Sequence, residues 1–516
     1  MIAALLAALL LLPLQADDQE PLVLSLEDCL RLAASRNLAI AGARLDAEAT
    51  LEGFGESWGA FDTIFSSSAF WSEGTTAPTP SNFVGGVDVG GSGTTHREIW
   101  QFATGLSGQL LTGTTWSFNV LPQHVVVETE DLDPDTANSF SDLFTGDWNL
   151  DITHPLLRGG GDYARSALLL ARQDAEIAAL AAETVASTTL RNVTLAYWNL
   201  VFARQDRATR ELSVTLATEL LDITRRKFEQ GLQNRIEVTT AEAELATRRE
   251  ELLSARTVEL NAEDLLRRLV LAPQDAETWA RPLQASTQPS PPQEGTLDTE
   301  QAIETAMVWR ADVAEQRRRV ERADVEVERA RNQEDPRLDL TGGYGINANA
   351  GDASYSKMFS GLDDTNFDET HVSLIFELPL GNRTAGYALR RRQVERQRAG
   401  VALSETEMNA VGEVRTAVRE VELQVLRVAV TAESVRLQNE VYEGEKRRLE
   451  NDLSTPFQVR QSQRDLLTAI DNETRAKLDL EVARAALLAV QGRLLAAYGL
   501  ERSMPELSLT EAPPAP

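Results

Sequence analysis

The most constraining feature of this sequence is a pair of long stretches without glycine or proline. The first runs from Asp162 to Gln230 and the second from Leu232 to Ala272. Because both residue types interrupt helices, such stretches favour continuous helix, and about 70 residues at about 1.5 Å each would span about 100 Å. A short segment, "GLQN" beginning at Gly231, separates them. The pattern predicts a long helical hairpin that reverses at Gly231.

The chain also contains two copies of one plan. The segment "LSLEDCLRLAASRNLAIA" beginning at Leu24 matches "LDTEQAIETAMVWRADVA" beginning at Leu297. Near the ends of the two copies, Gly231 aligns with Asp452. The number of positions between these two residues is smaller than the number between Leu24 and Leu297. Self-similarity over such distances indicates an internal duplication. The smaller second offset means that the first copy carries about 50 additional residues.

The duplication and the local composition divide the chain into five expected parts. The first is a secretory signal peptide, since "MIAALLAALLLLPLQA" is apolar but too short to span a membrane. The expected parts are a signal peptide 1–16, a first repeat 17–272, a Pro-rich linker 273–296, a second repeat 297–500 and a tail 501–516.

Each repeat is expected to run helix, strand region, helical hairpin. Ser25 and Asp298 are the expected N-caps of the opening helices. The expected ranges in the first repeat are a helix at about 25–52, strands at about 61–154 and a hairpin at about 162–271. Those in the second repeat are a helix at about 298–333, strands at about 336–380 and a hairpin at about 385–499.

Apolar residues in the long helices follow the alternating three-and-four spacing of coiled coils. In the first repeat the pattern begins at Leu190, Val193, Tyr197 and Leu200. A longer stripe in the second repeat contains Val411, Val414, Val418, Val421, Val425, Val428, Ala432 and Val435. Each stripe is expected to face a partner helix.

The predicted strand regions alternate apolar and polar residues. In "WQFATGLSGQLL", Trp100, Phe102 and Leu106 alternate with polar or small residues, and "TTWSFNV" repeats the pattern from Trp116. Alternating segments of about ten residues, rich in aromatics and separated by turns, are typical of a transmembrane β-barrel. An exported chain without a long apolar helix can cross a membrane only as such a closed barrel.

The first copy contains more strand-like runs than one hairpin requires. They lie near 61–72, 99–110, 114–127 and 146–154. The extra hairpin either enlarges the barrel or stands outside the membrane as a long loop. The aromatic alternation from Trp100 to Val120 favours burial in a membrane or a sheet.

Composition and motifs argue against several other functions. The net charge of −29 disfavours a nucleic-acid partner. The single cysteine, Cys29, lies in a helical pattern and is expected to be half-buried. No nucleophile or metal-binding motif is present, and the four histidines are scattered, so we expect no catalytic residue, no metal and no cofactor. The four histidines are His96, His124, His154 and His371.

With these features together, the sequence resembles the TolC-like outer-membrane efflux proteins over residues 24–500. The resemblance rests on "LSLEDCLRLAASRN", "ITHPLLRGGG", "LAYWNLVFA" and the "GL" turn followed by "IEVTTAEAELA". It implies an α+β membrane protein, a homotrimer with one shared β-barrel in the outer membrane of a Gram-negative-type envelope. The coiled-coil hairpins would form a tunnel through the periplasm.

What the resemblance implies about function is a passive exit duct of a tripartite efflux pump or a type I secretion system. Its expected partners are two further copies of itself, a periplasmic adaptor, outer-membrane lipid and, indirectly, an inner-membrane transporter. The two hairpin turns are the expected adaptor-docking sites, since each presents an exposed leucine. The docking residues are Gly231, Leu232, Gln233, Asp452, Leu453 and Ser454.

Two further sets of residues follow from the same comparison. A periplasmic gate would involve Glu237 near the first turn and Gln458 and Gln461 near the second, where the family pattern has aspartates. Pro155 and Pro379 are expected at the strand-to-helix junctions, because proline ends a strand and fixes φ before a helix.

Two other classes of function compete with the duct. One is a trimeric coiled-coil spacer or adhesin of the cell envelope, which would not transport anything. The other is a module that docks on the coiled coil of a partner. The alternating strand segments and the duplicated hairpins favour the duct.

Overall fold

The computed structural model describes most of the chain, in two compact units. One unit is helical and includes the ends of both hairpins, and the other contains the main sheet. The described residues are 21–78, 83–84, 87–88, 93–130, 139–271, 279, 281–292, 297–350, 355–356, 368–451 and 453–499. The expected signal peptide 1–16, the tail 501–516 and Asp452 lie outside these residues.

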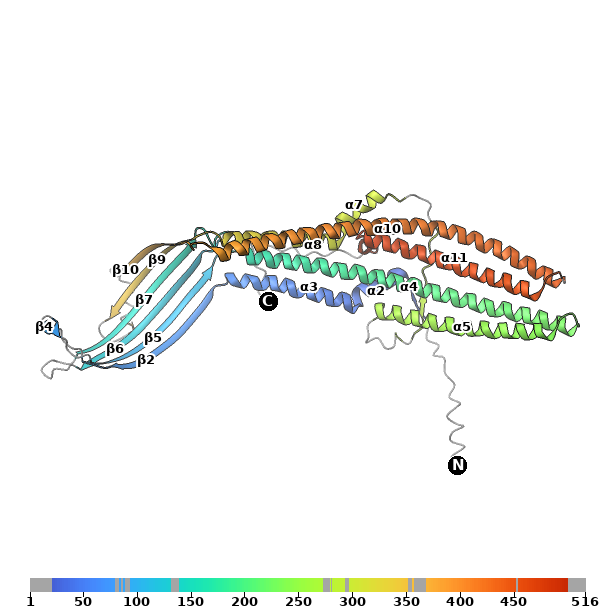
Figure 1. Cartoon of the computed structure of the whole chain (residues 1–516). Helices are drawn as coiled ribbons and strands as arrows, with labels where there is room; N and C mark the ends of the chain where they lie inside the picture. The colour runs from blue at the N-terminus through green and yellow to red at the C-terminus, as the bar shows by residue number, and fades with distance from the viewer. Residues whose placement is uncertain are drawn as a thin grey trace, which may run out of the picture. The chain divides into compact units, whose positions relative to one another are not determined.

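Two long antiparallel hairpins dominate the helical unit (Figure 1). The first consists of α4 (Ser166–Glu229) and α5 (Arg235–Val270), and the second of α10 (Arg383–Glu450) and α11 (Pro456–Val490). Both α4 and α10 begin within the residues of the other unit. The two hairpins of the duplicated plan are therefore present, and each reverses within a few residues.

The opening helix of each repeat is broken in two, whereas the sequence pattern predicted one continuous helix. The elements are α2 (Leu26–Arg36), α3 (Leu38–Ser57), α7 (Thr299–Trp309) and α8 (Ala311–Asn332). At the first break, Asn37 ends α2 in an extended conformation, and its side-chain Oδ1 accepts a hydrogen bond from the Ala39 N–H at 2.9 Å. An asparagine side chain competes with the helix in this way, which explains the break in the first copy.

The predicted N-caps of the opening helices are present. The Ser25 hydroxyl accepts from the Asp28 N–H, and the Asp28 carboxylate accepts from the Ser25 N–H, which completes a capping box. In the second copy the Asp298 carboxylate accepts from the N–H groups of Glu300 and Gln301.

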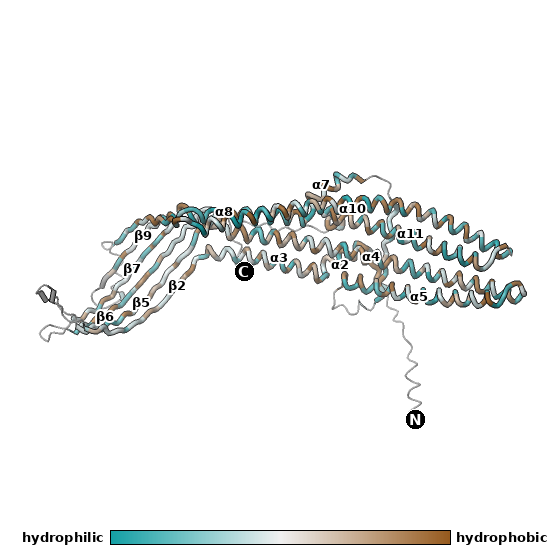
Figure 2. The backbone as a smooth tube through the Cα atoms, viewed as in Figure 1, coloured by the Kyte–Doolittle hydropathy of each residue, from teal (hydrophilic) through white to brown (hydrophobic). Residues whose placement is uncertain are grey.

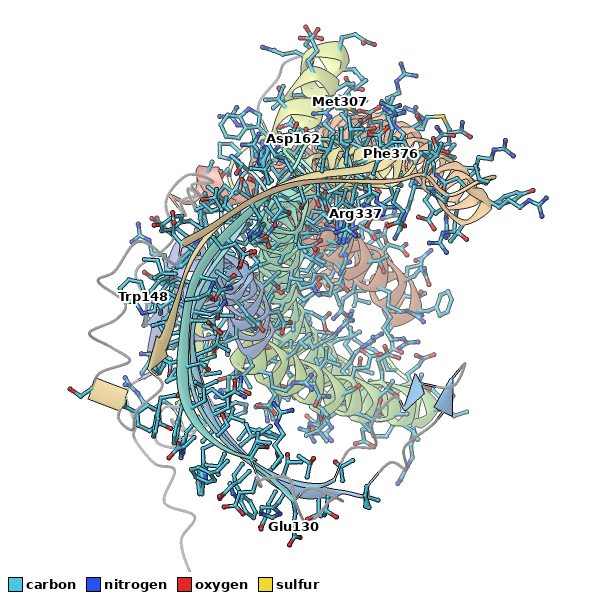
Figure 3. All side chains as sticks on the ribbon, turned by 90° about the vertical axis from the view of Figure 1, so that its left-hand side faces the viewer. Glu130, Trp148, Asp162, Met307, Arg337 and Phe376 are labelled. Carbon is cyan, nitrogen blue, oxygen red and sulfur yellow. The ribbon has the colours of Figure 1, made fainter. Side chains whose placement is uncertain are left out.

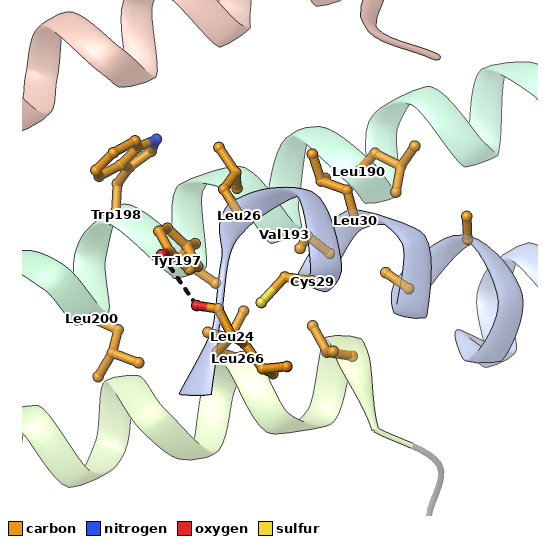
Figure 4. Packing of buried hydrophobic residues seen from close by; sticks show 14 of the residues in the cluster. Leu24, Leu26, Cys29, Leu30, Leu190, Val193, Tyr197, Trp198, Leu200 and Leu266 are labelled. Atoms are coloured by element: carbon orange, nitrogen blue, oxygen red, sulfur yellow. Dashed lines mark hydrogen bonds between the residues drawn. The ribbon is translucent and has the colours of Figure 1, made fainter. Parts of the chain in front are cut away.

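One core cluster joins α2, α4 and α5 with a small parallel sheet of β1 (Leu22–Leu24) and β8 (Leu283–Ala285). The predicted stripe of α4 is fully buried there, and the Cys29 side chain is buried too rather than half-buried as expected. Figure 4 shows Tyr197 reaching the Leu24 carbonyl, at 3.4 Å from its hydroxyl. The same hydroxyl accepts a hydrogen bond from the Thr287 N–H at 2.8 Å. The buried phenol is thus satisfied on both sides.

The coiled-coil stripe of α10 packs against α11. Val421 and Val428 of α10 contact Ala476, Leu480 and Ala483 of α11. Towards the ends of the hairpins, Tyr442 and Leu449 of α10 pack in a cluster with Leu220 of α4. The predicted stripe therefore faces a partner helix from Val414 to Val428, although Ala432 is exposed.

The second unit contains a six-stranded antiparallel sheet, in the order β10-β9-β7-β6-β5-β2 (Figure 1). All five neighbouring pairs are antiparallel. The strands are β2 (Ile64–Thr76), β5 (Thr94–Gln109), β6 (Thr115–Glu130), β7 (Ser139–Pro155), β9 (Arg337–Ala350) and β10 (Asp368–Glu377). A separate two-stranded piece joins β3 (Phe83–Val84) to β4 (Val87–Asp88).

The extra hairpin of the first copy lies within this sheet. Strand β5 pairs with β2 along the whole length of β2, and β6 pairs with β7 from Thr115 to Thr129. Of the two expectations for the additional residues, the structure supports the larger sheet. The strands are also longer than predicted, since β5, β6 and β7 contain 16, 16 and 17 residues.

Helices in the described ranges all mix apolar and polar residues, as the brown and teal segments of Figure 2 show. None of them contains an apolar stretch long enough to span a bilayer.

Candidate functional site: hairpin ends and sheet faces

The first hairpin end is closed by a glycine in the left-handed region. Gly231 has φ +74°, a conformation that glycine adopts without steric cost. Its N–H donates to the Phe228 carbonyl at 2.9 Å, and the Leu232 N–H donates to the Lys227 carbonyl at 2.9 Å. These two bonds form a Schellman motif, which satisfies the last carbonyls of α4. The hairpin end is therefore a defined turn and not a loose loop.

The side chains at this turn project into solvent. Leu232 is 59% exposed, and Ile236, in the first turn of α5, is 68% exposed. Gln233 is partly buried. Asn234 caps α5 by accepting a hydrogen bond from the Ile236 N–H at 3.1 Å. Leu232 was predicted from the sequence as a docking residue and Ile236 was not, because a single apolar residue in a helical pattern normally indicates a buried position.

The second hairpin end shares with the first the hydrogen bond from the leucine N–H to the carbonyl five residues earlier, and the helix that follows is capped differently. The Leu453 N–H donates to the Arg448 carbonyl at 2.8 Å, and α11 begins with a capping box between Thr455 and Gln458. Leu453 is exposed, and so is Phe457, which was not predicted from the sequence as a docking residue. An exposed phenylalanine at the start of a helix makes this end as apolar as the first.

Ser454 belongs to a small polar network at the second end. Its hydroxyl lies 2.6 Å from Glu445 Oε2 and 2.9 Å from Gln458 Oε1. The hydrogen bond from Ser454 holds the pKa of the Glu445 carboxyl below its usual value. Gln458, expected at the gate, is thus engaged in the turn itself, and Gln461 donates to Asp465 along α11 at 2.9 Å.

Glu237 is the expected gate residue that contacts the other hairpin. One of its carboxylate oxygens lies 3.9 Å from Nη1 of Arg460, which comes from α11 and is 8% exposed. At that distance the pair is a charge contact and not a hydrogen bond. Among the described residues, Nη1 of Arg460 has no hydrogen-bond partner. This guanidinium is buried, and a buried charge is costly unless an opposite charge lies near it. Glu237 is therefore the main counter-charge of Arg460 at Nη1.

Two lysines add further links between the hairpins near their ends. Lys227 Nζ of α4 donates to the Leu449 carbonyl of α10 at 2.7 Å. Lys446 Nζ of α10 lies 3.4 Å from a carboxylate oxygen of Glu219 on α4. With the Arg460 contact, three cationic side chains bind one hairpin to the other at this level.

The junction prolines stand at the helix-connected end of the sheet. Pro155 is the last residue of β7 and pairs with Asp339, and Pro379 follows β10 by two residues. After Pro155 the chain turns through Gly159, whose N–H donates to Asn332 Oδ1 at 2.8 Å. The glycine run beside Pro155 is therefore part of a turn at the start of α4.

The two faces of the sheet differ sharply in polarity. One row of paired residues across all six strands reads Phe65, Leu106, Phe118, Leu150, Tyr344, Thr370. The next row, on the opposite face, reads Ser66, Gly105, Asn119, Asn149, Gly345, Glu369. Figure 3 shows Trp148 and Phe376 of the apolar face on the convex side and Arg337 on the concave side. An apolar convex face suits lipid and a polar concave face suits water.

The four histidines all lie in this sheet and contact side chains from other parts of it, and His371 of β10 reaches across Gly343 of β9 to Asp151 of β7. His124 Nε2 lies 2.6 Å from Asp142, His371 Nε2 lies 3.2 Å from Asp151, and His96 and His154 contact Glu73 and Thr114. Within the described ranges, no group of three or more His, Cys, Asp or Glu side chains could hold a metal ion.

A sheet with one apolar and one polar face, together with long paired helices, defines a membrane channel-tunnel. The family model "Outer membrane efflux protein" matches residues 135–270 and 302–493. The chain belongs to this family, and it is an outer-membrane efflux channel and not an enzyme. This confirms the resemblance stated from the sequence.

Solved structures of bacterial channels share the fold. The Campylobacter jejuni CmeC outer membrane channel has a TM-score of 0.63 and 16% identity, covering 91% of this chain and 86% of its own. The outer membrane protein VceC from Vibrio cholerae has a TM-score of 0.62 and 15% identity, covering 90% and 96%. The open state of the Neisseria gonorrhoeae MtrE outer membrane channel has a TM-score of 0.59 and 15% identity, covering 91% and 89%. No curated protein matches the sequence.

Proposed function

We propose that three copies of this chain form the passive exit duct of a tripartite efflux pump or a type I secretion system. The hairpin ends would dock on a periplasmic adaptor, which an inner-membrane transporter supplies with cargo. The sheets would contact outer-membrane lipid, and the two repeats, 17–272 and 297–500, would each contribute one hairpin to the tunnel. The observation that carries this proposal is the pair of apolar hairpin ends in the helical unit of an outer-membrane efflux channel.

The hairpin ends have the character of a binding surface. Leu232, Ile236, Leu453 and Phe457 expose between 59% and 69% of their surface. Residues at the far ends of hairpins have no core to fill, so these four gain by burial against a partner. We place the docking surface at these four residues together with Gly231, Gln233, Asp452 and Ser454.

Unpaired helix faces support assembly into a trimer. One face of α10 exposes Leu423, Leu426, Val430, Leu437 and Val441, away from the stripe that packs on α11. The spacing of the first three residues is three and four, which is the spacing of a second helix contact. A neighbouring copy would bury this face.

The charge contacts between the hairpins support a closed resting state. Arg460, Lys227 and Lys446 hold the two hairpins together near their ends, and opening would require that these contacts separate. We propose Glu237 and Arg460 as the main gate pair. Gln458 and Gln461 would stabilise the second hairpin end beside it.

The test is a double variant at the hairpin ends, Leu232→Asp/Leu453→Asp, expressed in a strain that lacks the native channel. We expect normal trimers by native mass spectrometry, unchanged pore conductance in planar bilayers, and loss of export in cells. Leu45→Asp, which changes an equally exposed leucine of α3, is the matched control and should retain export.

Three outcomes would overturn parts of this proposal. Normal export by the double variant would refute docking at the hairpin ends. A purified trimer that never conducts, even with Arg460 replaced, would refute the duct and favour a spacer or adhesin. A monomer under all conditions would refute the trimer.

A further inference from the structure

We propose that the sheet closes by pairing β2 of one copy with β10 of the next, with Phe65 opposite Phe376. Since each copy contributes six strands, the ring of three contains eighteen. This inference rests on the trimer proposed above, and it adds the edge strands, their register and the size of the ring.

The two edges of the sheet are open in the single chain. Strands β2 and β10 stand at the ends of the strand order, and no described strand pairs with their outer sides. Every residue of β10 is exposed, and so is every residue of β2 except Ser72. Long exposed edges of this kind are liable to aggregate unless another strand covers them. The apolar face continues to both edges, with Phe65 66% exposed and Val372 75% exposed.

The direction of the edge strands permits them to pair with each other across copies. Five antiparallel steps separate β10 from β2, so the two strands run in opposite directions. When copies are related by rotation about the ring axis, β2 of one copy meets β10 of the next as an antiparallel neighbour. The whole ring is then antiparallel, as in bacterial outer-membrane barrels.

The faces of the edge strands limit the register. On β2 the apolar convex face carries Phe65, Ala69 and Trp71, and on β10 it carries Val372 and Phe376. A shift of one residue would put every side chain of one strand on the wrong face. Placing Phe65 opposite Phe376 satisfies this condition and aligns Ile64, the first residue of β2, with Glu377, the last of β10.

The stagger within one copy matches a closed barrel in this register. The paired row that starts at Phe65 crosses the sheet and reaches β10 at Thr370, six residues before Phe376. In the next copy Thr370 would pair with Trp71, six residues beyond Phe65. The row therefore shifts by six residues for every six strands. A stagger of one residue per strand tilts strands by about 36°, as in an eight-stranded barrel of shear 8, and outer-membrane strands tilt by about 35–45°.

An eighteen-stranded ring has a consequence for the pore. Barrel diameter grows roughly in proportion to the number of strands, and barrels of about 16–18 strands leave an aqueous channel. Removing β5 and β6 from each copy would leave twelve strands and a lumen about two-thirds as wide. The extra hairpin thus widens the opening in the outer membrane.

Paired cysteines test the register. In a Cys29→Ala background, the matched pairs Phe65→Cys/Phe376→Cys and Ala69→Cys/Val372→Cys place cysteines opposite each other between copies. The same four substitutions recombined, Phe65→Cys/Val372→Cys and Ala69→Cys/Phe376→Cys, are four residues out of register. That error is about 13 Å along the strand, whereas a disulfide needs Cβ atoms about 3.5–4.5 Å apart.

Mild oxidation of the trimers in outer-membrane vesicles, followed by denaturing electrophoresis, gives the result. We expect both matched pairs to form about tenfold more covalently linked trimer than either recombined pair, because of this distance requirement. Equal linking in the matched and recombined pairs, or no linking in trimers confirmed by native mass spectrometry, would overturn the edge pairing alone. Absence of any trimer, including in the Cys29→Ala parent, would instead refute the proposed function on which the inference rests.

Discussion

Asn37 and Arg310 occupy equivalent positions of the two copies, and each ends the first helix of its copy in an extended conformation. Asn37 makes the break with its own side chain, which accepts from the Ala39 N–H and donates to the Leu269 carbonyl. Arg310 makes it with a guanidinium that contacts Asp312 at 2.7 Å and Glu413 at 2.6 Å. The same bend is thus held by different chemistry in each copy.

Replacing Arg310 should weaken the helical unit more than replacing Asn37. Arg310→Met leaves two carboxylates without their cation, and we expect a loss of about 1–3 kcal/mol. Asn37→Ala removes an asparagine cap and should cost about 1 kcal/mol. Thermal unfolding of the detergent-solubilised protein, followed by circular dichroism, measures both. Equal losses, or a larger loss for Asn37→Ala, would contradict this assignment.

The Arg460 and Glu237 pair makes a prediction about gating. Arg460→Glu should place two carboxylates together and raise the fraction of conducting channels in planar bilayers several-fold. The charge swap Arg460→Glu/Glu237→Arg should restore most of the closed population, because the attraction is rebuilt with reversed signs. A swap that conducts as much as the single variant would show that the contact does not hold the hairpins closed.

Cys29 makes a prediction about reactivity and pH. Burial raises the pKa of its thiol to about 12, and only the thiolate reacts readily. A maleimide or aromatic disulfide reagent at pH 8 should therefore label the native protein very slowly and the denatured protein quickly. Rapid labelling of the native trimer would mean that this core opens.

The same shift affects stability. The thiol of the unfolded chain has an ordinary pKa near 9 and deprotonates first, so the stability it contributes is complete below pH 9 and is lost as the pH rises towards about 12. Cys29→Ala should lose this part of the alkaline destabilisation. Unfolding of the two proteins between pH 8 and pH 11 provides the comparison.

Tyr197 makes a prediction about the core. Tyr197→Phe keeps the ring but leaves the Thr287 N–H without its acceptor, and a buried unsatisfied donor costs about 1–3 kcal/mol. Leu30→Ala, in the same cluster, should cost about 2–5 kcal/mol because it leaves a cavity. If Tyr197→Phe is as stable as the native chain, water must replace the hydroxyl.

The sequence was sufficient to predict the long helices, the main strands and their apolar faces, but not which strands are neighbours in the sheet. The absence of glycine and proline on either side of Gly231, and the valine stripe of α10, predicted both hairpins. Helical periodicity and helix-breaking residues act over a few neighbouring positions, so both can be recognised in the sequence. Alternation in β5 and β6 showed which side chains share a face, yet it carries no information about which strand lies alongside. The sheet order and the stagger from Phe65 to Thr370 come only from the three-dimensional structure.

The candidate site residues also divide into those that the sequence predicted and those that only the structure revealed. Leu232 and Leu453 were found because each stands in a turn signal. Arg460 was missed because a single arginine in a helix is normally solvated, and its role depends on Glu237 of another helix. The break at Asn37 was missed because asparagine is only mildly unfavourable in helices, and its hydrogen bond to the Leu269 carbonyl involves a segment far away along the chain.

The order of the strands bears on how a chain of this kind can change its sheet. Strands β5 and β6 follow each other in the chain and lie between β2 and β7 in the sheet, and all the neighbouring pairs are antiparallel. Without β5 and β6, β2 and β7 would still run in opposite directions and could pair with each other. A hairpin can therefore be inserted or lost at this position without reversing any other strand, so evolution can change the width of such a sheet in steps of two strands.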